Sequence, residues 1–332
     1  MSARVLRSIS ELADIAGPVV IAAGVFDGFH LGHRAVIDRA IAGARAAGGT
    51  PVVATFDPHP AAVLRPGSAP PLLTSTRHKI RLLADAGIAH VLVLGFDAAF
   101  AAQPPEIFIQ ALADACRPLR EICVGEDWAF GKDRAGNLSL LTVLGKKLGF
   151  TATGHLPVIV DGKAVSSTAI RAAVESGALA EAARLLGREF SVLGSVIEGR
   201  RLGRTLGFPT ANVRPESEQL PPNGVYAVRA HAAADQTRNA ERGTRKEMIS
   251  PPPAVVGYRG IANIGIRPTV ADGGTQRLVE VHLFDFTGDL YGRDIEVFFG
   301  RFVRPEQKFP GLDALRAQIA SDVAVVRAAT SA

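Results

Sequence analysis

Two segments far apart in the chain carry residue types that suit phosphate binding. The first spans Gly24–His33 and has the sequence GVFDGFHLGH, and the second spans Gly207–Asn212 and has the sequence GFPTAN. Glycines let a phosphate chain approach the backbone closely, while imidazole, hydroxyl and amide groups offer hydrogen bonds or hard oxygen ligands. We therefore expect two sites that use ATP, with different chemistry at each.

The first motif joins an expected strand to an expected helix. Val19–Val25 is a short apolar run closed by glycine, which is typical of a strand buried on both faces, and apolar residues recur at helical spacing over Leu31–Ala47. His30 and His33 then share a face at the helix N-terminus, where unpaired amides favour an anion. Two imidazoles there can donate hydrogen bonds to charge that develops on phosphate oxygens. The alternative is that the histidines only cap the turn or face solvent.

The rest of the first half alternates between strand and helix patterns. Such alternation favours a doubly wound, Rossmann-like α/β sheet, with its ligand at the carboxyl ends of the strands. Further strands are expected at Pro51–Phe56, His90–Phe96, Glu121–Val124 and His155–Val160, and helices at Ser75–Ala86 and Pro105–Cys116.

Another helix start follows at Ser166–Arg171, with the sequence SSTAIR. The hydroxyls of Ser166, Ser167 and Thr168 can receive the first amides of this helix, and Arg171 falls one turn inside it, where it can reach a triphosphate. The alternative is a plain helix cap followed by an arginine that faces solvent.

After a helical stretch at Ala169–Leu186, strand signals replace the alternation. Short runs rich in β-branched and aromatic residues, punctuated by Gly and Pro, favour a compact antiparallel barrel closed by a helix at Leu312–Ala328. A boundary fits near Gly187–Phe190, so we expect domains at residues 1–187 and 188–332. The barrel strands are expected at Ser191–Ile197, Gly224–Ala230, Gly260–Ile264, Arg277–Phe286 and Asp294–Phe299.

Oxygen ligands and a carboxylate mark a candidate site in the second domain. Thr210 and Asn212 lie on one side of an extended chain, and their hydroxyl and amide oxygens suit Mg²⁺ that bridges phosphates. The basic, glycine-rich segment Glu198–Gly207 either folds over a polyphosphate or forms a plain solvated loop. Glu280 lies in an expected strand, where it either takes a proton from an attacking hydroxyl or faces solvent.

Several motifs together resemble a known family. His30–His33 looks like the HxGH signature of nucleotidylyltransferases, and three further segments resemble the adenylyltransferase module of bacterial bifunctional riboflavin kinase/FAD synthetases: Thr55–Pro60, Val124–Gly131 and Val165–Arg171. The second half resembles a riboflavin kinase domain. That likeness rests on Glu198–Asn212, Asn223–Tyr226, Gly265–Thr269, Glu280–His282, Asp289–Gly292 and Arg304–Glu306. The motifs follow the family order over almost the whole chain.

In the first domain, the resemblance implies that His30, His33 and Arg171 are catalytic and that Asp127 and Trp128 contact the flavin. Trp128 stands where the family more often carries another aromatic residue, and it keeps a flat apolar surface. Asp127 follows an expected strand, where its carboxylate could bind a ribose hydroxyl or position the flavin, and its alternative role is to form a turn.

In the second domain, the resemblance implies that Thr210 and Asn212 hold the metal and that Glu280 is the base. Residues expected to bind ATP or its phosphates in the two domains are Gly24, Asp27, Gly28, Gly32, Ser166, Ser167, Thr168, Gly199, Arg201 and Gly203.

One segment departs from the family pattern. Between Tyr226 and Gly260 the chain carries an insertion at about 231–253 that is polar, charged and rich in proline. This composition predicts a disordered excursion. Lengthening a surface loop costs little entropy, so the barrel need not be disturbed.

The composition is that of a folded protein large enough for two cores, with 332 residues, 47% hydrophobic and 21% charged. The net charge of +5 is mild and no stripe of basic and aromatic residues accompanies it, so we expect no nucleic-acid partner. No run reaches the roughly 20 apolar residues of a membrane span, and no signal peptide is evident, so we expect a cytoplasmic protein without a membrane partner. Cys116 and Cys123 are expected to be buried thiols.

We therefore predict a flavin-cofactor synthase with two activities. The second domain would phosphorylate riboflavin to FMN with ATP, and the first would adenylylate FMN to FAD with a second ATP, releasing pyrophosphate. Mg²⁺ is the expected cofactor, and riboflavin, FMN and ATP are the expected partners of a monomer or weak homo-oligomer. Two alternatives are a riboflavin kinase that has lost adenylylation and a sensor that binds flavin or nucleotide without turnover.

Overall fold

The computed structural model describes residues 3–199, 203, 206–217, 219–232, 248–249, 257–268 and 275–329. These residues form two compact units, of which the first holds the described parts of 1–72, 76–167 and 241–251, and the second holds the others. The chain passes from one unit to the other within a helix, between Ser167 and Thr168. The functional boundary at residue 187 stays a prediction.

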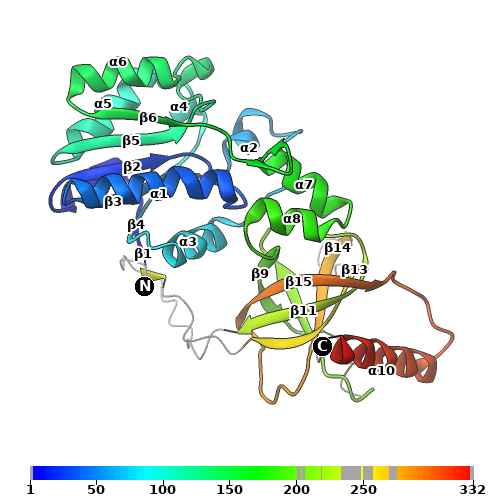
Figure 1. Ribbon diagram of the computed structural model, residues 1–332. Helices are drawn as coiled ribbons and strands as arrows, with labels where there is room; N and C mark the ends of the chain where they lie inside the picture. Colours follow the sequence, from blue (N-terminus) through cyan, green and yellow to red (C-terminus); the bar gives the residue numbers. More distant parts are fainter. Residues whose placement is uncertain are drawn as a thin grey trace. The chain divides into compact units, whose positions relative to one another are not determined.

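The first unit is built on one sheet with the strand order β12-β1-β4-β3-β2-β5-β6 (Figure 1). Strands β1 to β6 are parallel, and β12 pairs antiparallel with the edge strand β1. The predicted Rossmann-like sheet is therefore confirmed. Its strands are β1 Ala3–Leu6, β2 Val19–Ala23, β3 Thr50–Asp57, β4 His90–Gly95, β5 Leu119–Gly125, β6 Thr151–His155 and β12 Met248–Ile249.

Alternate residues of each strand enter apolar cores on the two faces of this sheet. In β2, Val19, Ile21 and Ala23 join the core that α5 and α6 cover, whereas Val20 and Ala22 join the core under α1 and α3. Burial on both faces explains why the strand is a continuous apolar run. The helices and short elements are η1 Ile9–Asp14, α1 Leu31–Ala46, α2 Pro60–Leu64, α3 Thr76–Asp85, α4 Ala98–Ala101, α5 Pro105–Ala115, η2 Lys132–Arg134 and α6 Leu138–Leu148.

The two cysteines belong to these cores. Cys116 lies in the core on one face of the sheet and Cys123 in the core on the other, and both are free thiols. Burial raises the pKa of the Cys116 thiol to about 12, so it stays protonated near neutral pH. The predicted buried thiols are confirmed.

The strand order reverses between β2 and β5. From β2 the chain proceeds to β3 and β4 on one side, and it returns to place β5 on the other side of β2. In open α/β sheets, ligands bind at such a switch point, outside the carboxyl ends of the strands. The motif Gly24–His33 follows β2, and Asp127 and Trp128 follow β5, so these sequence-predicted residues lie at the same edge of the sheet.

Two expectations for the end of the first half are wrong. The strand predicted at His155–Val160 is not continuous: His155 ends the sheet strand β6, whose polar residues give little apolar signal, and Ile159–Val160 forms the separate short strand β7. The helical stretch predicted at Ala169–Leu186 is two helices, interrupted at Gly177, whose φ of 78° is left-handed. The elements here are β7 Ile159–Val160 and β8 Lys163–Ala164, which form a hairpin, and α7 Ser167–Glu175 and α8 Leu179–Leu186.

The second unit contains a closed barrel with the strand order β10-β14-β13-β11-β15-β9 (Figure 1). All its pairings are antiparallel, and closure satisfies the edges that an open sheet would expose. The predicted barrel with a terminal helix is confirmed. Its elements are β9 Ser191–Ile197, β10 Ala211–Pro215, β11 Gly224–Ala232, β13 Tyr258–Pro268, β14 Thr275–Leu283, β15 Asp294–Arg304 and α10 Leu312–Ala328.

Helix α10 is fastened to the barrel by apolar packing and one buried ion pair. Val326 belongs to a buried apolar cluster with Val225 of β11, Ile261 of β13 and Phe284, which follows β14. The Arg304 guanidinium donates through Nε to both oxygens of Asp322 at 3.0 Å and through Nη2 to Oδ2 at 2.8 Å. A second pair, in which Arg327 donates to Asp285, is exposed to solvent.

Most of the predicted insertion at 231–253 lies outside the described residues. Residues 231 and 232 end β11, and residues 248 and 249 form β12, in which Ile249 pairs with Ala3 and Met248 with Arg4. In the described part of the chain, no helix is both long and apolar enough to cross a membrane.

We predict that Arg304→Met destabilises the second unit by about 3–5 kcal/mol, because it leaves the Asp322 carboxylate buried without its cation. Urea unfolding of the whole protein, followed by circular dichroism, measures the loss. The matched control is Arg327→Met, which removes an exposed pair and should cost much less. Equal losses of unfolding free energy in the two variants would show that the buried pair contributes no more than the exposed one.

Candidate active sites

The turn between β2 and α1 is strained. Phe26, Gly28 and Phe29 have φ angles of 54°, 83° and 42°. Glycine adopts such an angle freely, whereas each phenylalanine costs about 1–3 kcal/mol there. Both phenylalanine rings are buried, and the Phe26 ring lies so close to Gly24 that a side chain at position 24 would approach it within 3.0 Å. Strain that surrounding packing holds in place is typical of a functional turn.

His30 and His33 cap α1 reciprocally. The backbone N–H of His33 donates to His30 Nδ1 at 3.2 Å, and the backbone N–H of His30 donates to His33 Nδ1 at 3.4 Å. The two rings stack with centroids 3.5 Å apart. Because both Nδ1 atoms accept, the neutral rings carry their protons on Nε2. Capping therefore uses Nδ1 and leaves Nε2 for another partner, so a capping role and the predicted role in anion binding are compatible.

The imidazole of His33 is held in its neutral form. Desolvation lowers the pKa of His33 well below 6.5, and the electrostatic effects of His30 and Lys79 lower it further. A neutral ring with its proton on Nε2 is a hydrogen-bond donor at the helix N-terminus, where unpaired amides also favour an anion. His33 can thus donate to an anion without a change of protonation.

The two motifs predicted to share the first site meet in the structure. Ser167, the first residue of α7, donates its hydroxyl to the carbonyl oxygen of Asp27 at 2.9 Å. Gly32 lies beside the His30 ring, and a Cβ at Gly32 would be 3.2 Å from that ring and 3.8 Å from the carbonyl oxygen of Val165. Segments far apart in the sequence are therefore joined around this turn.

The remaining residues predicted on this helix start lie on either side of the boundary between units. Ser166 is half-buried in the first unit, next to Ser167. Thr168 is exposed and Arg171 is half-buried, and both belong to the second unit. Arg171 is one turn from Ser167 in α7.

Lys79 on α3, which the sequence patterns did not single out, is a buried ammonium at this turn. Its Nζ donates to the carbonyl oxygen of Val25 at 2.9 Å and to Thr55 Oγ1 at 3.0 Å, while Thr55 Oγ1 donates to the same carbonyl at 2.9 Å. The signal that could have found it is its position four residues before the buried Leu83, inside the apolar stripe of the helix.

The residues predicted to contact the flavin lie in the turn after β5. Asp127 is exposed, and Trp128 is partly buried, with its ring stacked on Phe130 at a centroid distance of 4.3 Å. The backbone N–H of Trp128 donates to the carbonyl oxygen of Gly125 at 3.0 Å, which closes the turn. Trp128 is therefore a rigid aromatic surface at the ligand-binding edge of the sheet.

In the barrel, strand pairing brings the predicted metal ligand and base together. Asn212 on β10 is the direct antiparallel partner of Glu280 on β14. Direct partners project their side chains to the same face of a sheet. Thr210 precedes β10 and lies two residues from Asn212 on the extended chain. The amide of Asn212 and the carboxylate of Glu280 therefore lie on the same face of the barrel, with Thr210 two residues from the amide along the chain.

The glycine-rich loop approaches these ligands closely. A Cβ on Gly199 would overlap the Asn212 side chain, and a Cβ on Gly203 would lie 2.9 Å from Thr210 Oγ1. Gly203 also accepts a backbone hydrogen bond from Phe208 at 2.8 Å, so the loop turns back on the second motif. Arg201, predicted to bind phosphate, lies outside the described residues.

Two residues beside the second site were not assigned roles from the sequence. His282, on the same face of β14 as Glu280, lies with Nδ1 2.9 Å from the carbonyl oxygen of Pro209 and so fixes the chain just before Thr210. Asn263 on β13 is the direct partner of Glu280 on its other side. The first contact joins residues 73 positions apart, and the second depends on the register of β13 against β14, so neither could be read from sequence.

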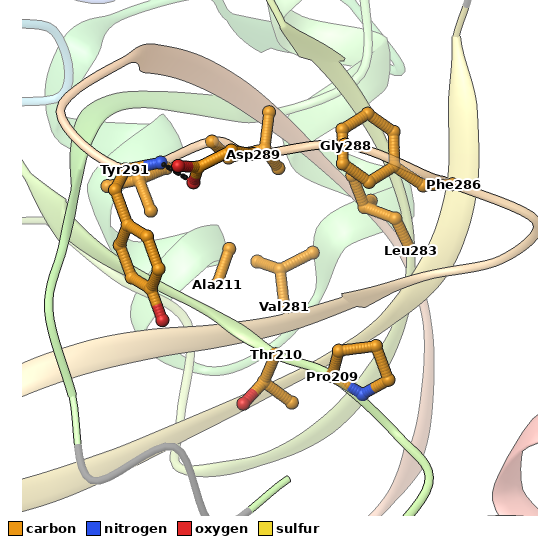
Figure 2. Close-up of a pocket in the computed structure, with 11 residues that line it drawn as sticks. Pro209, Thr210, Ala211, Val281, Leu283, Phe286, Gly288, Asp289 and Tyr291 are labelled. Atoms are coloured by element: carbon orange, nitrogen blue, oxygen red, sulfur yellow. Dashed lines mark hydrogen bonds between the residues drawn. The ribbon is translucent and has the colours of Figure 1, made fainter. Parts of the chain in front are cut away.

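A cavity of about 250 Å³ lies on the opposite face of β14. Ala211 and Val281, which are direct strand partners, line it together with Pro209 and Thr210. Figure 2 shows the Tyr291 ring on one side of the cavity and Phe286 and Leu283 on the other. The other lining residues are Val196, Gly288, Asp289 and Leu290. This arrangement suits a flat, largely apolar ring system next to the oxygen ligands.

Among the described residues there is no group of three or more His, Cys, Asp or Glu side chains that could hold a metal ion. Thr210 and Asn212 nevertheless fit a hard cation that takes most of its ligands from phosphates and water, because both offer neutral oxygen atoms. The site thus suits a metal that arrives with a polyphosphate.

Comparisons with known proteins assign the two halves to different families. The FAD synthetase family model matches residues 13–169, and the riboflavin kinase family model matches residues 186–330. A relative from Escherichia coli (strain K12), named bifunctional riboflavin kinase/FMN adenylyltransferase, is 39% identical over 98% of this chain and 97% of its own. A relative of the same name from Haemophilus influenzae is 34% identical over 98% of each chain.

One solved structure has a similar fold over the full length. It is a protein from Streptococcus pneumoniae named macrolide-efflux protein, with a TM-score of 0.77 and 28% sequence identity. The match covers 97% of this chain and 98% of that chain.

We predict that His33 stays neutral when the pH falls well below 6.5, because protonation would place a cation in a desolvated site beside His30 and Lys79. Long-range ¹H–¹⁵N spectra of the imidazoles, recorded over a pH series, report both the midpoint and the tautomer. The expected signals are those of a ring protonated on Nε2. A His33 midpoint at or above 6.5 would contradict the prediction.

Proposed function

The chain belongs to the bifunctional riboflavin kinase/FMN adenylyltransferase family, and we propose that its two candidate sites divide the two reactions between them. The protein phosphorylates riboflavin to FMN and adenylylates FMN to FAD. The kinase reaction belongs to the barrel and the adenylyl transfer to the sheet unit. The direct pairing of Asn212 with Glu280 supports the first assignment most strongly.

In the kinase reaction, Glu280 accepts the proton of the terminal ribityl hydroxyl of riboflavin. The oxygen then forms a bond to the γ-phosphorus of ATP, and the bond from that phosphorus to the bridging oxygen breaks, which releases ADP. His282 contributes by holding the carbonyl of Pro209 and thereby the position of Thr210. The glycine-rich loop lies against both oxygen ligands, where its backbone can meet phosphate oxygens.

Mg²⁺ is the proposed cofactor of this site. Thr210 Oγ1 and Asn212 Oδ1 would hold the ion, which would neutralise charge on the β- and γ-phosphates of ATP. The two ligands are neutral, so the negative charge that attracts the cation comes from the nucleotide itself.

The cavity beside Thr210 is the proposed site of the adenine ring of this ATP. Its walls are largely apolar, and Tyr291 and Phe286 offer flat surfaces (Figure 2). Because the cavity lies on the face of β14 opposite Glu280, the polyphosphate would pass over the chain at Pro209–Thr210 to reach the riboflavin hydroxyl. This route would bring the γ-phosphate to Asn212 and Glu280.

In the adenylyl transfer, a phosphate oxygen of FMN forms a bond to the α-phosphorus of a second ATP, and pyrophosphate leaves. His30 and His33 donate their Nε2–H groups to phosphate oxygens, and Arg171 adds positive charge. No base is required, because the attacking phosphate is already anionic. Asp127 and Trp128 are the proposed flavin contacts, and the turn at Gly24, Asp27, Gly28 and Gly32 and the hydroxyls of Ser166, Ser167 and Thr168 are the proposed phosphate contacts.

Incubation with riboflavin, ATP and Mg²⁺, followed by chromatographic separation of the flavins, tests the proposed pair of reactions. FAD is the expected product. FMN as the end product would instead indicate a kinase that has lost adenylylation, and unchanged riboflavin would indicate a sensor without turnover.

Two substitutions should separate the activities. His33→Ala should stop the reaction at FMN, because it removes a donor to the transferring phosphates. Glu280→Gln should leave riboflavin unconverted yet still allow supplied FMN to become FAD, because it removes only the kinase base. The same chromatographic assay measures both variants. FAD formation by His33→Ala at the normal rate would contradict the assignment of the first site.

The close contact between the glycine-rich loop and Asn212 allows a separate test of the kinase site. Gly199→Ala should lower riboflavin phosphorylation by about 100-fold, because the added methyl group displaces Asn212. Steady-state rates for riboflavin measure this loss, while adenylylation of supplied FMN should be unchanged. Gly311→Ala is the matched control in the same unit, because a Cβ at Gly311 meets open space. Equal kinase rates in the two variants would contradict the assignment.

A further inference from the structure

The buried ammonium of Lys79 has no obvious packing purpose. The side chain is 5% exposed and lies on the face of α3 that packs with Ile80 and Leu83 into an apolar core. A charge in such a place is costly unless it is paired. Its two hydrogen-bond acceptors, the carbonyl oxygen of Val25 and Thr55 Oγ1, are both uncharged. We therefore expect Lys79 to have a role beyond packing, one that an apolar side chain of the same length could not perform.

The carbonyl that Lys79 holds stands directly before the strained turn. Phe26, the next residue, has a left-handed φ angle, and Gly28 and Phe29 follow with angles of the same sign. Ser167 holds the middle of the turn through the carbonyl of Asp27. Lys79 thus holds the start of the same turn whose end carries the capped histidines.

Lys79 also acts on the histidines through its charge. The ammonium is one of the causes that lower the pKa of His33. The charges that act on Lys79 itself come from Asp27 in the turn and Asp57 at the end of β3. Desolvation lowers the pKa of Lys79 to about 8, and these two carboxylates oppose that shift. The cation is therefore retained at neutral pH and is lost at moderately alkaline pH.

We propose that Lys79 is a positioning residue for adenylyl transfer: its hydrogen bond to the Val25 carbonyl fixes the turn before His30 and thereby the place from which His33 donates to phosphate. This inference rests on the proposed role of the two histidines. It assigns the residue no contact with substrate. Its two effects are separable, because the hydrogen bond to Val25 depends on a donor, whereas the effect on His33 depends on charge.

The test compares Lys79→Met, Lys79→Gln and the control Lys147→Met in the full chain. Lys147 is an exposed lysine of the same unit, in the last turn of α6. Lys79→Met should lower kcat for FAD formation from supplied FMN by about 100-fold, with a smaller change in KM, because positioning is lost and binding is retained. Riboflavin phosphorylation by the same molecules should stay within about twofold of the parent, which reports folding of the second unit, while the retained KM for FMN reports folding of the first.

The pKa of His33 supplies a readout that a merely structural lysine would not move. In both Lys79→Met and Lys79→Gln, the NMR midpoint of His33 should rise toward 6.5, because a repelling cation has been removed. Lys79→Gln should retain more turnover than Lys79→Met, because it keeps a donor. Normal FAD formation by Lys79→Met, or an unchanged His33 midpoint in both variants, would overturn the proposal.

If Lys79→Met misfolds and loses both activities, Thr55→Val provides the test of the proposal. This substitution removes one partner of Lys79 without changing any charge, so adenylylation should fall about tenfold while the His33 midpoint stays fixed. Unchanged adenylylation would overturn the proposal. Failure of the histidine assignment itself is distinguishable, because His33→Ala would then form FAD normally whatever the result at Lys79.

Discussion

The register of β10 against β14 is the constraint on which the second site depends. Asn212 and Glu280 face each other as direct partners, while Ala211 and Val281, the next pair, line the cavity on the opposite face. A slip of one residue would exchange the two faces of a strand and separate the ligand from the base. The closed barrel resists this slip, because β10 is also paired with β9 and β14 with β13.

The first site also requires fixed geometry, which here comes from a turn and not from a pair of strands. The turn after β2 is strained, and hydrogen bonds from Lys79, Ser167 and the helix caps hold it at its start, middle and end. Donors that are oriented before the substrate arrives need no reorganisation when charge develops on phosphate oxygens. In both sites, neutral groups on rigid backbone are therefore set beside the expected path of a polyphosphate.

Local patterns predicted much of this arrangement, and contacts between distant segments accounted for what they missed. The apolar run of β2 and the following helix placed His30 and His33 correctly at a helix start. The polar edge strand β6 gave too little apolar signal and was predicted too late in the chain. Lys79 was not predicted because a single lysine on the apolar face of a helix does not form a recognisable sequence motif. The pairing of Asn212 with Glu280 required knowledge of the barrel register, which motif order alone does not supply.

The most direct test of two separate phosphorus chemistries is the fate of each phosphate of ATP. The protein is incubated with riboflavin and ATP that carries ³²P at either the α or the γ position, and FMN and FAD are then separated and counted. We predict that the γ label enters FMN and is retained in FAD, whereas the α label enters FAD and is absent from FMN. An α label in FMN, or FMN without the γ label, would contradict it.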